Sequence, residues 1–174
     1  MASDTESDEP LFRLSESPAH LLRRAQQFAS ETFSDLGMSD GVTLRQSVVL
    51  AAVAEQEGLS QSDLVVATGI DRSTLADMIA RMEARGLVTR SAAEDDARAK
   101  SVSLTNLGRD ALEASLPAMK SVDAALMDIL PKNRRKSFLD ILRKLSDAAD
   151  MDLLETNGSS KSKKKKKKKK KKKD

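Results

Sequence analysis

Apolar residues recur every three or four positions along most of this chain, which is the spacing of helices that bury one face. The pattern predicts a first helix from Pro18 to Gly37, and a second helix that Thr43 caps and Gly58 ends. The same period returns after residue 105 and predicts a long helix that ends at Pro131, then a last helix to about residue 148. The apolar stripe of the first helix is broad enough to need a partner helix.

Two shorter helices are expected after the second one. Ser60 begins the first of them, with Asp63 three residues later as an acidic variant of the capping box, and a Thr-Gly pair ends it. Asp71 or Ser73 can cap the next helix, whose apolar positions are expected to face the core. These positions are Leu75, Met78, Ile79 and Met82. A short helix, a tight turn and a longer amphipathic helix are the order of a helix-turn-helix motif.

The hydrophobic period changes after this motif. Residues 87–89 and 100–105 have the composition and alternation of two short strands, and residues 94–99 form a polar, charged connector. Two strands joined in this way make a hairpin, and a hairpin beside a helix-turn-helix makes a winged helix. We therefore expect a mostly α fold with a small β-hairpin wing, in which a winged helix-turn-helix is flanked by long helices.

The longer helix of the motif presents a polar face that suits a DNA groove. With its apolar stripe buried, the opposite face carries Arg72, Ser73, Thr74, Asp77 and Arg81. Arginine can make a bidentate contact to guanine, serine and threonine can donate to phosphates or bases, and the N-terminal end of such a helix usually reaches base edges. The alternative is the ordinary polar surface of an amphipathic helix, and the adjacent hairpin favours the DNA interpretation.

The residues around the hairpin resemble a known family. The runs that carry the resemblance are Arg85-Gly86-Leu87-Val88-Thr89-Arg90, then Asp96-Ala97-Arg98, then Val102-Ser103-Leu104-Thr105-Asn106-Leu107-Gly108. Together they resemble the MarR (multiple antibiotic resistance regulator) family of bacterial winged-helix transcription factors, over about residues 18 to 150. The resemblance implies a homodimer whose first and last two helices interlock, so that two winged domains meet successive major-groove faces of a pseudo-palindromic site.

The resemblance also implies roles for individual residues. By position, Arg98 would enter the minor groove from the tip of the wing, and Asp96 would orient that arginine or brace the wing. Ser60 to Ser62 would meet backbone phosphates at a helix N-terminus. The expected DNA-binding residues are Arg98, Ser73, Thr74, Arg72, Asp77, Ser60, Ser62 and Lys100. No catalytic or metal-binding residue is expected.

Each of these roles has a plainer alternative. Asp96 can be only a turn residue, and Arg90 can only close its strand. Arg81 and Arg85 can instead form ion pairs with Asp77 and Glu83 along their own helix. Residues 71–100 contain six basic and six acidic residues, so affinity for DNA must come from placement rather than from bulk charge. The near-neutral region also leaves open a winged-helix adaptor that binds proteins without specific DNA binding.

The resemblance suggests a regulatory ligand. Many members of this family release DNA when a small anionic aromatic or phenolic compound binds between the dimer helices and the winged domain. We accordingly expect a repressor whose effector is an aromatic carboxylate or its coenzyme A thioester, in a pocket lined by Leu, Met, Ala and Phe. The candidate carboxylate partners are His20, Arg23, Arg24 and Arg45. Ordinary exposed surface positions are the alternative for all four.

Composition excludes several other functions. The chain has no Cys and one His, which excludes a thiol-oxidation switch and leaves too few ligands for a His-based zinc cluster. It has no Gly-rich phosphate loop and no Ser/His/Asp set beyond the single His, so we expect neither an enzyme nor a cofactor. No apolar run approaches the roughly 20 residues of a membrane span, and the acidic start does not fit a signal peptide. We expect a cytoplasmic bacterial protein without a membrane partner, on the nucleoid when bound to DNA.

Charge divides the chain into an acidic body and a basic tail. Lys161 and residues 163–173 supply 12 of the 30 basic residues, which leaves 18 basic and 26 acidic residues, a net charge of −8, in residues 1–160. The tail is either an arm that binds nucleic acid non-specifically or an appended low-complexity segment. The expected regions are an acidic flexible arm that packs partly at the dimer interface (1–17), the dimerisation helices (18–38 and 106–155), the winged helix-turn-helix (42–105) and a disordered poly-lysine tail (156–174).

Overall fold

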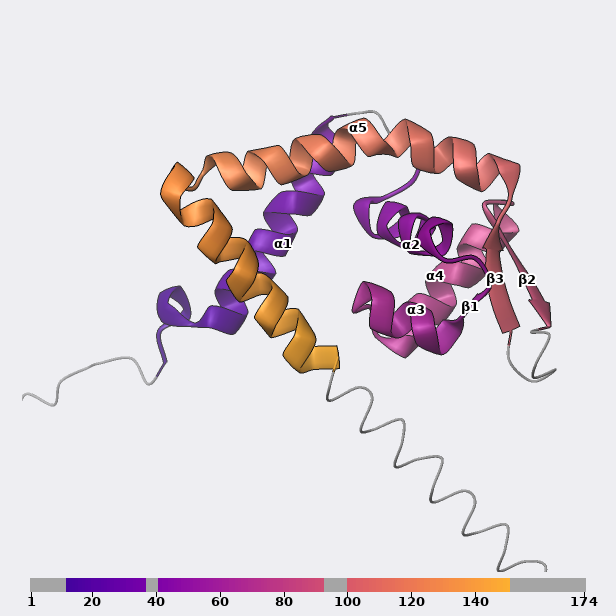
Figure 1. The fold of residues 1–174 in the computed structure, drawn as a ribbon, viewed down its shortest axis with the longest axis horizontal. Coiled ribbons are helices and arrows are strands. Elements are labelled where there is room, and N and C mark those ends of the chain that lie inside the picture. The colour runs from indigo at the N-terminus through magenta and orange to yellow at the C-terminus, as the bar shows by residue number, and fades with distance from the viewer. Residues whose placement is uncertain (1–11, 37–40, 93–99, 151–174) are drawn as a thin grey trace, which may run out of the picture.

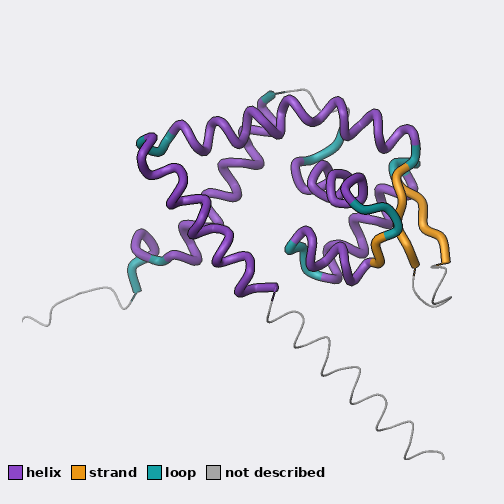
Figure 2. The backbone as a smooth tube through the Cα atoms, viewed as in Figure 1, coloured by secondary structure: helices purple, strands orange, loops and turns teal. Residues whose placement is uncertain are grey.

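The fold is mostly helical with one small antiparallel sheet (Figures 1 and 2). The computed structural model describes residues 12–36, 41–92 and 100–150. In chain order the elements are the 3₁₀ helix η1 (Leu14–Glu16), α1 (Pro18–Asp35), α2 (Leu44–Glu55), β1 (Leu59–Ser60), α3 (Gln61–Thr68), α4 (Arg72–Ala84), β2 (Val88–Ala92), β3 (Lys100–Leu104), α5 (Asn106–Asp128) and a last helix over residues 132–150. The predicted class is therefore confirmed.

Reciprocal side-chain caps begin α2 and α3. The Gln46 amide donates to the Thr43 hydroxyl at 3.3 Å, and the Thr43 amide donates to the Gln46 side chain at 2.9 Å. The same capping box joins Ser60 and Asp63, as the sequence predicted. Because each box satisfies two backbone donors at a helix start, both helices begin where the sequence indicates.

The sheet has three strands rather than the predicted two. Its order is β1-β3-β2, with Leu59 opposite Val102 and Arg90 also opposite Val102 from the other side. The strand β1 has only two residues, too few to show an alternating pattern, so no periodicity could indicate it. The strand β2 is also longer than predicted, because it continues to Ala92 through polar residues.

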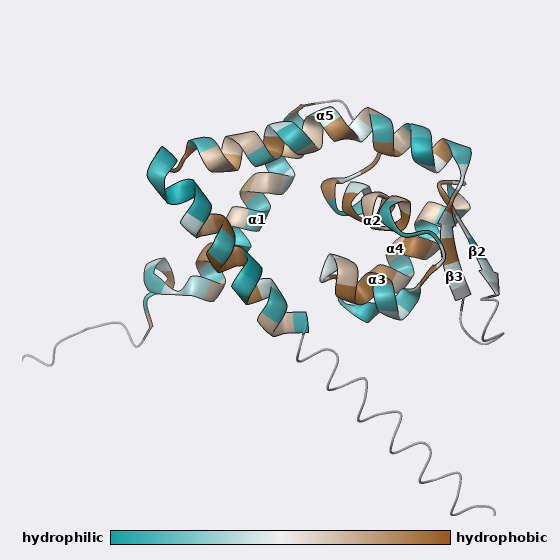
Figure 3. Ribbon diagram, in the orientation of Figure 1, coloured by the Kyte–Doolittle hydropathy of each residue, from teal (hydrophilic) through white to brown (hydrophobic). Residues whose placement is uncertain are grey.

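A single buried cluster joins α2, α3, α4 and the sheet. Figure 3 shows hydrophobic stretches on these elements where they meet. Its fully buried larger members are Val49, Leu50 and Val53 of α2, Leu64 of α3, Leu75, Ile79 and Met82 of α4, and Val88 and Val102 of the sheet. Burying such side chains contributes about 1.5–3 kcal/mol each, so this cluster holds the hairpin against the helix pair.

The start of α5 is fixed to the base of the hairpin. The Thr105 hydroxyl caps the helix by accepting from the Gly108 amide, and it donates to the Gly86 carbonyl at 2.5 Å. Gly108 packs directly on the backbone of Leu87, because a Cβ atom placed on it would lie 1.9 Å from the Leu87 carbonyl oxygen. Only glycine permits this approach.

At its far half, α5 packs against α1 in a second, smaller cluster. Ala29 and Phe33 of α1 are buried against Ala118 and Val122 of α5. In Figure 1, α5 extends from the wing to α1 across the molecule. One continuous helix therefore joins the two hydrophobic clusters.

Many large apolar side chains outside these clusters are exposed in the single chain. They lie mostly on η1, α1, the end of α5 and the last helix, or directly beside these elements. Among them Phe12, Leu14, Ile129, Ile141 and Leu145 are each more than half exposed. An apolar surface of this kind is typical of a protein–protein interface.

No helix in the described part of the chain is long and apolar enough to cross a membrane. Within residues 12–36, 41–92 and 100–150 there is also no group of three or more His, Cys, Asp or Glu side chains placed to hold a metal ion.

Candidate nucleic-acid interface

The helix α4 lies with its predicted apolar stripe in the core. Leu75, Met78, Ile79 and Met82 are all buried, as expected. The residues that the sequence placed on the polar face are exposed or half-buried: Arg72, Ser73, Asp77 and Arg81 are exposed, and Thr74 is half-buried. The N-terminal half of α4 therefore offers a polar surface, supported from behind by a packed core.

Two of the predicted DNA-binding residues meet at this surface. The Arg72 guanidinium donates to the Ser62 hydroxyl at 3.0 Å, from the first residue of α4 to the first turn of α3. The sequence placed both residues in the candidate set and did not predict their contact. The hydrogen bond restricts the arginine to the side of α4 that faces α3.

The start of α4 depends on one carboxylate. Asp71, and not Ser73, is the cap: its Oδ1 accepts from the Thr74 amide at 3.0 Å and from the Ser73 hydroxyl at 2.7 Å. Hydrogen bonds from Thr74 and then from Ser73 stabilise the ionised form and hold the pKa of the Asp71 carboxyl well below its usual range. Asp71 is therefore an anion at neutral pH, placed where the helix dipole favours negative charge.

The Ser60 hydroxyl is already used at the start of α3. It donates to Asp63 Oδ2 at 2.6 Å and accepts from the Asp63 amide at 3.2 Å. The Ser60 amide also donates to this carboxylate, at 3.1 Å. A phosphate at this helix start would face the Asp63 carboxylate, so Ser62 is the better placed of the two predicted serines.

Charged residues at the C-terminal end of α4 and just after it connect this helix to other elements. Arg85 donates to the Gly41 carbonyl at 2.7 Å. Arg90 of β2 forms an ion pair with Glu83 of α4, and Glu83 raises the pKa of the Arg90 guanidinium by accepting its hydrogen bonds. Arg90 thus does more than close its strand, because the pair fixes the base of the wing to α4. The sequence did not predict this pair, since the partners belong to different elements.

The predicted wing tip lies outside the described residues. Asp96 and Arg98 both belong to that segment, so their places are not part of the site geometry. Lys100 is the first residue of β3 and pairs with Ala92, the last residue of β2. This pair lies at the end of the sheet that points away from α5 (Figure 1).

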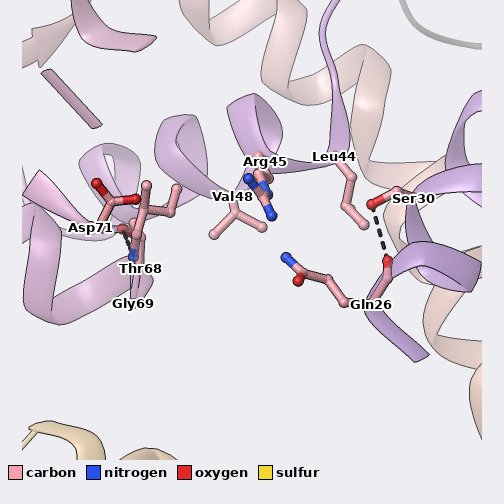
Figure 4. A pocket seen from close by; sticks show the side chains of 9 residues that line it. Gln26, Ser30, Leu44, Arg45, Val48, Thr68, Gly69 and Asp71 are labelled. Carbon is pink, nitrogen blue, oxygen red and sulfur yellow. Dashed lines mark hydrogen bonds between the residues drawn. The ribbon is translucent and has the colours of Figure 1, made fainter. Parts of the chain in front are cut away.

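A pocket lies between α1, α2 and the turn that joins α3 to α4 (Figure 4). Its volume is about 330 Å³, and it is lined by Gln26, Ser30, Leu44, Arg45, Val48, Thr68, Gly69, Ile70 and Asp71. Of the four predicted carboxylate partners, only Arg45 lines it; His20, Arg23 and Arg24 do not. Figure 4 shows the polar ends of Arg45 and Gln26 directed toward one another.

The lining of this pocket differs from the expected Leu, Met, Ala and Phe. Its apolar members are Leu44, Val48 and Ile70, and the others are polar, charged or glycine. Phe33 and Ala29 of α1 are buried against α5 instead, and Phe28 of the same helix is exposed and does not line the pocket. An arginine and a carboxylate in one small pocket suit a ligand with an anionic group and a separate hydrogen-bond donor.

A helix-turn-helix with an exposed recognition face, a hairpin fixed to it and long helices around it define a winged-helix DNA-binding regulator. A family model described as MarR family matches residues 40–99. The chain is 32% identical over 148 residues to the HTH-type transcriptional repressor NicR of Pseudomonas putida, a match that covers 83% of this chain and 94% of NicR. The chain therefore belongs to the MarR family of transcriptional regulators.

Solved structures agree with this assignment. One of them is BpsR of Bordetella bronchiseptica, whose DNA binding is regulated by 6-hydroxynicotinic acid. BpsR is 34% identical to this chain with a TM-score of 0.71, and the match covers 80% of this chain and 99% of that chain. PcaV of Streptomyces coelicolor, in complex with its natural ligand, is 27% identical with a TM-score of 0.71, over 81% of this chain and 99% of that chain. PcaV, like NicR, is a transcriptional regulator.

Proposed function

We propose that this protein is a homodimeric, sequence-specific repressor of the bacterial cytoplasm that leaves its operator when a small aromatic acid binds. The observation that carries the DNA-binding part is the exposed start of α4, where Arg72 is held against Ser62. A guanidinium at this end of a recognition helix can reach a guanine edge in the major groove. NicR is a repressor and the DNA binding of BpsR is regulated, which supports the same activity here.

The other contacts follow from position on the two elements that would meet DNA. Ser73, Thr74 and Asp77 share the exposed side of α4 with Arg72, and we assign them to the major groove or its edge. Ser62, and with it Ser60, would approach backbone phosphates at the start of α3. For the wing we assign Arg98 to the minor groove, Asp96 to bracing that arginine, and Lys100 to a phosphate.

Dimerisation is proposed from the exposed apolar side chains on η1, α1, the end of α5 and the last helix. These elements lie within the regions 1–17, 18–38 and 106–155, which we assign to the dimer, and the winged helix-turn-helix within 42–105 stays outside it. A two-fold dimer buries such a face against its own copy and doubles a small number of well-placed DNA contacts.

The effector is proposed from the pocket beside Arg45. A volume of about 330 Å³ is near the lower end for ligand sites, so it fits a single-ring acid better than a whole coenzyme A thioester. Arg45 would pair with the carboxylate of the acid, since arginine matches carboxylate geometry. The compound that regulates DNA binding by BpsR, 6-hydroxynicotinic acid, is a single-ring acid of this kind and is the first compound to test.

The test of DNA binding uses the purified full chain and the promoter region beside its own gene. Saturable binding that depends on a palindrome and weakens with salt is expected. Arg72→Ala and Arg98→Ala should each weaken operator binding by about 1–3 kcal/mol at fixed salt. Arg143→Ala is the matched control, because it removes the same charge from an exposed position on the last helix and should leave the affinity nearly unchanged.

Two results would contradict the proposal. Equal binding to operator and scrambled DNA would favour the protein-binding adaptor, which the six acidic and six basic residues of region 71–100 also permit. Unchanged affinity in Arg72→Ala would remove the start of α4 from sequence recognition.

A further inference from the structure

Asp71 takes part in two features of the fold, the start of α4 and the wall of the pocket. Its Oδ1 accepts the hydrogen bonds from Ser73 and Thr74 that begin the recognition helix α4. Asp71 also lines the pocket that Arg45 lines from α2 (Figure 4). The residue that caps the DNA-reading helix therefore also forms part of the wall of the pocket.

We propose that Asp71 sets the ligand specificity of this pocket and links its occupation to the start of α4. A ligand acid pairs with Arg45 through its carboxylate and donates a hydrogen bond from a ring hydroxyl or ring N–H to Asp71. Ser73 and Thr74 both donate to Oδ1, so the ligand would donate to Oδ2 and turn the carboxylate away from the first turn of α4. This inference rests on the proposed effector site and goes further by naming the group that selects the ligand.

The chemistry of the pocket explains the selection. At neutral pH the Asp71 carboxyl is ionised, as an ordinary aspartate is, and hydrogen bonds from Thr74 and Ser73 lower its pKa further. An ionised carboxylate only accepts hydrogen bonds. A second carboxylate on the ligand would be repelled at this end of the pocket, and a methyl ether would leave the carboxylate without a new donor. Thr68 is a weaker acceptor than Asp71, because its hydroxyl is neutral and already accepts from the Ile70 amide at 3.3 Å.

The link to DNA follows from Ser73. Its hydroxyl donates to Asp71 at 2.7 Å, which fixes its rotamer on the exposed side of α4. A ligand donor that draws the carboxylate toward the pocket weakens this hydrogen bond and the one from the Thr74 amide. The first turn of α4, where Arg72 and Ser73 are expected to meet DNA, then loses its cap.

The first experiment measures ligand binding by calorimetry with the full-length protein and three probes: 6-hydroxynicotinate, 6-methoxynicotinate and nicotinate. In the wild type we expect 6-hydroxynicotinate to bind at least about tenfold more tightly than either analogue, because a hydrogen bond to a charged group is among the strong ones. In Asp71→Asn and Asp71→Ser, which keep a helix cap and remove the charge, this preference should fall below about threefold. Asp63→Asn is the matched control, since it makes the same change at the start of α3.

The second experiment follows amide hydrogen exchange by NMR without DNA. Binding of 6-hydroxynicotinate should accelerate exchange of the Thr74 amide, which donates to the Asp71 side chain. The Arg109 amide is the internal reference, because it donates to the backbone carbonyl of Thr105 at 3.0 Å in the first turn of α5, which does not line the pocket. An unchanged Thr74 amide in the presence of bound ligand would overturn the link to α4.

The outcomes separate this inference from the proposed effector site. If 6-hydroxynicotinate binds and Arg45→Gln weakens it, while Asp71→Asn keeps the full preference over the analogues, the role of Asp71 is wrong and the effector site stands. If none of the three acids binds, or if Arg45→Gln has no effect on binding, the effector site and the role of Asp71 are both wrong. Neither result would alter the test of operator binding, which uses no ligand.

Discussion

Arg90 of β2 and Glu83 of α4 form an ion pair that fixes the base of the wing to the recognition helix. The side chains of Arg90 and Glu83 are 29% and 34% exposed, so solvent screens the ion pair only partly. The two elements that would read adjacent grooves are thereby held in one orientation. A rigid arrangement of this kind lowers the entropy lost when both elements engage DNA.

Glu83→Gln should lower the free energy of unfolding by about 0.5–1 kcal/mol, because it removes the charge while keeping the shape of the side chain. Urea denaturation of the full chain measures this. Asp140→Asn is the control, since the Arg143–Asp140 pair is more exposed and joins neighbouring turns of one helix. Equal changes in the free energy of unfolding would show that the Arg90–Glu83 pair stabilises the protein no more than an exposed pair within one helix.

Gly108→Ala should destabilise the protein by about 3 kcal/mol or more, because the new methyl group would overlap the Leu87 carbonyl oxygen. Thermal unfolding measures the loss. Gly58→Ala is a useful comparison, since a Cβ there meets no atom within 4 Å and tests only the cost of a positive φ of 79°. A smaller loss in Gly108→Ala than in Gly58→Ala would contradict the close packing of α5 on the hairpin.

Asp71 predicts a particular dependence of stability on pH. A carboxyl whose pKa is lower in the folded than in the unfolded protein stabilises the fold above the unfolded value, about 3.9, and loses this contribution as the pH falls. The melting temperature of the wild type should therefore fall more steeply below about pH 4 than that of Asp71→Asn, which keeps a cap and does not titrate. If the melting temperatures of the two proteins fall equally from neutral pH to about pH 3, the ionised Asp71 carboxylate does not stabilise the fold in this way.

Ile141→Glu should shift the proposed dimer toward monomer by about 100-fold or more in dissociation constant, because a carboxylate buried there in a dimer would lack a partner. Ile141 is 57% exposed in the single chain. Sedimentation equilibrium measures the change. Lys144→Glu, at an exposed polar position of the same helix, should leave the dimer intact, and a dimer unchanged in Ile141→Glu would place the interface elsewhere.

Removal of residues 161–174 should leave operator recognition intact and reduce salt-sensitive binding to unrelated DNA. These residues carry 12 of the 30 basic residues, and each phosphate that a lysine neutralises adds about −0.9 to the salt slope. Binding titrations at several salt concentrations measure both effects. Loss of sequence-specific binding in the shortened protein would mean that specificity does not lie within residues 60–100.

The sequence was sufficient for the elements whose signals are local. Thr43 and Ser60 cap helices through partners three residues away, and the stripe from Leu75 to Met82 follows the helical period, so all of these could be predicted. The strand β1 could not be predicted, because two residues have no period.

Contacts between elements were also beyond the sequence. The hydrogen bond from Arg72 to Ser62 and the ion pair of Arg90 with Glu83 depend on how helices and strands pack. The pocket around Arg45 likewise takes residues from three parts of the chain, and His20, Arg23 and Arg24 could not be separated from Arg45 by residue type alone.

The helix α5 is pressed onto Leu87 at one end and packed against Phe33 at the other. The helix α5 continues through Pro117 over 23 residues, so a change of its tilt at one of these contacts displaces the other. If the α1 ends of two such helices are joined in a dimer, a small change of helix tilt beside α1 becomes a larger change in the distance between the two wings. The spacing of the half-sites that such a pair tolerates would then be set by the angle of this one helix.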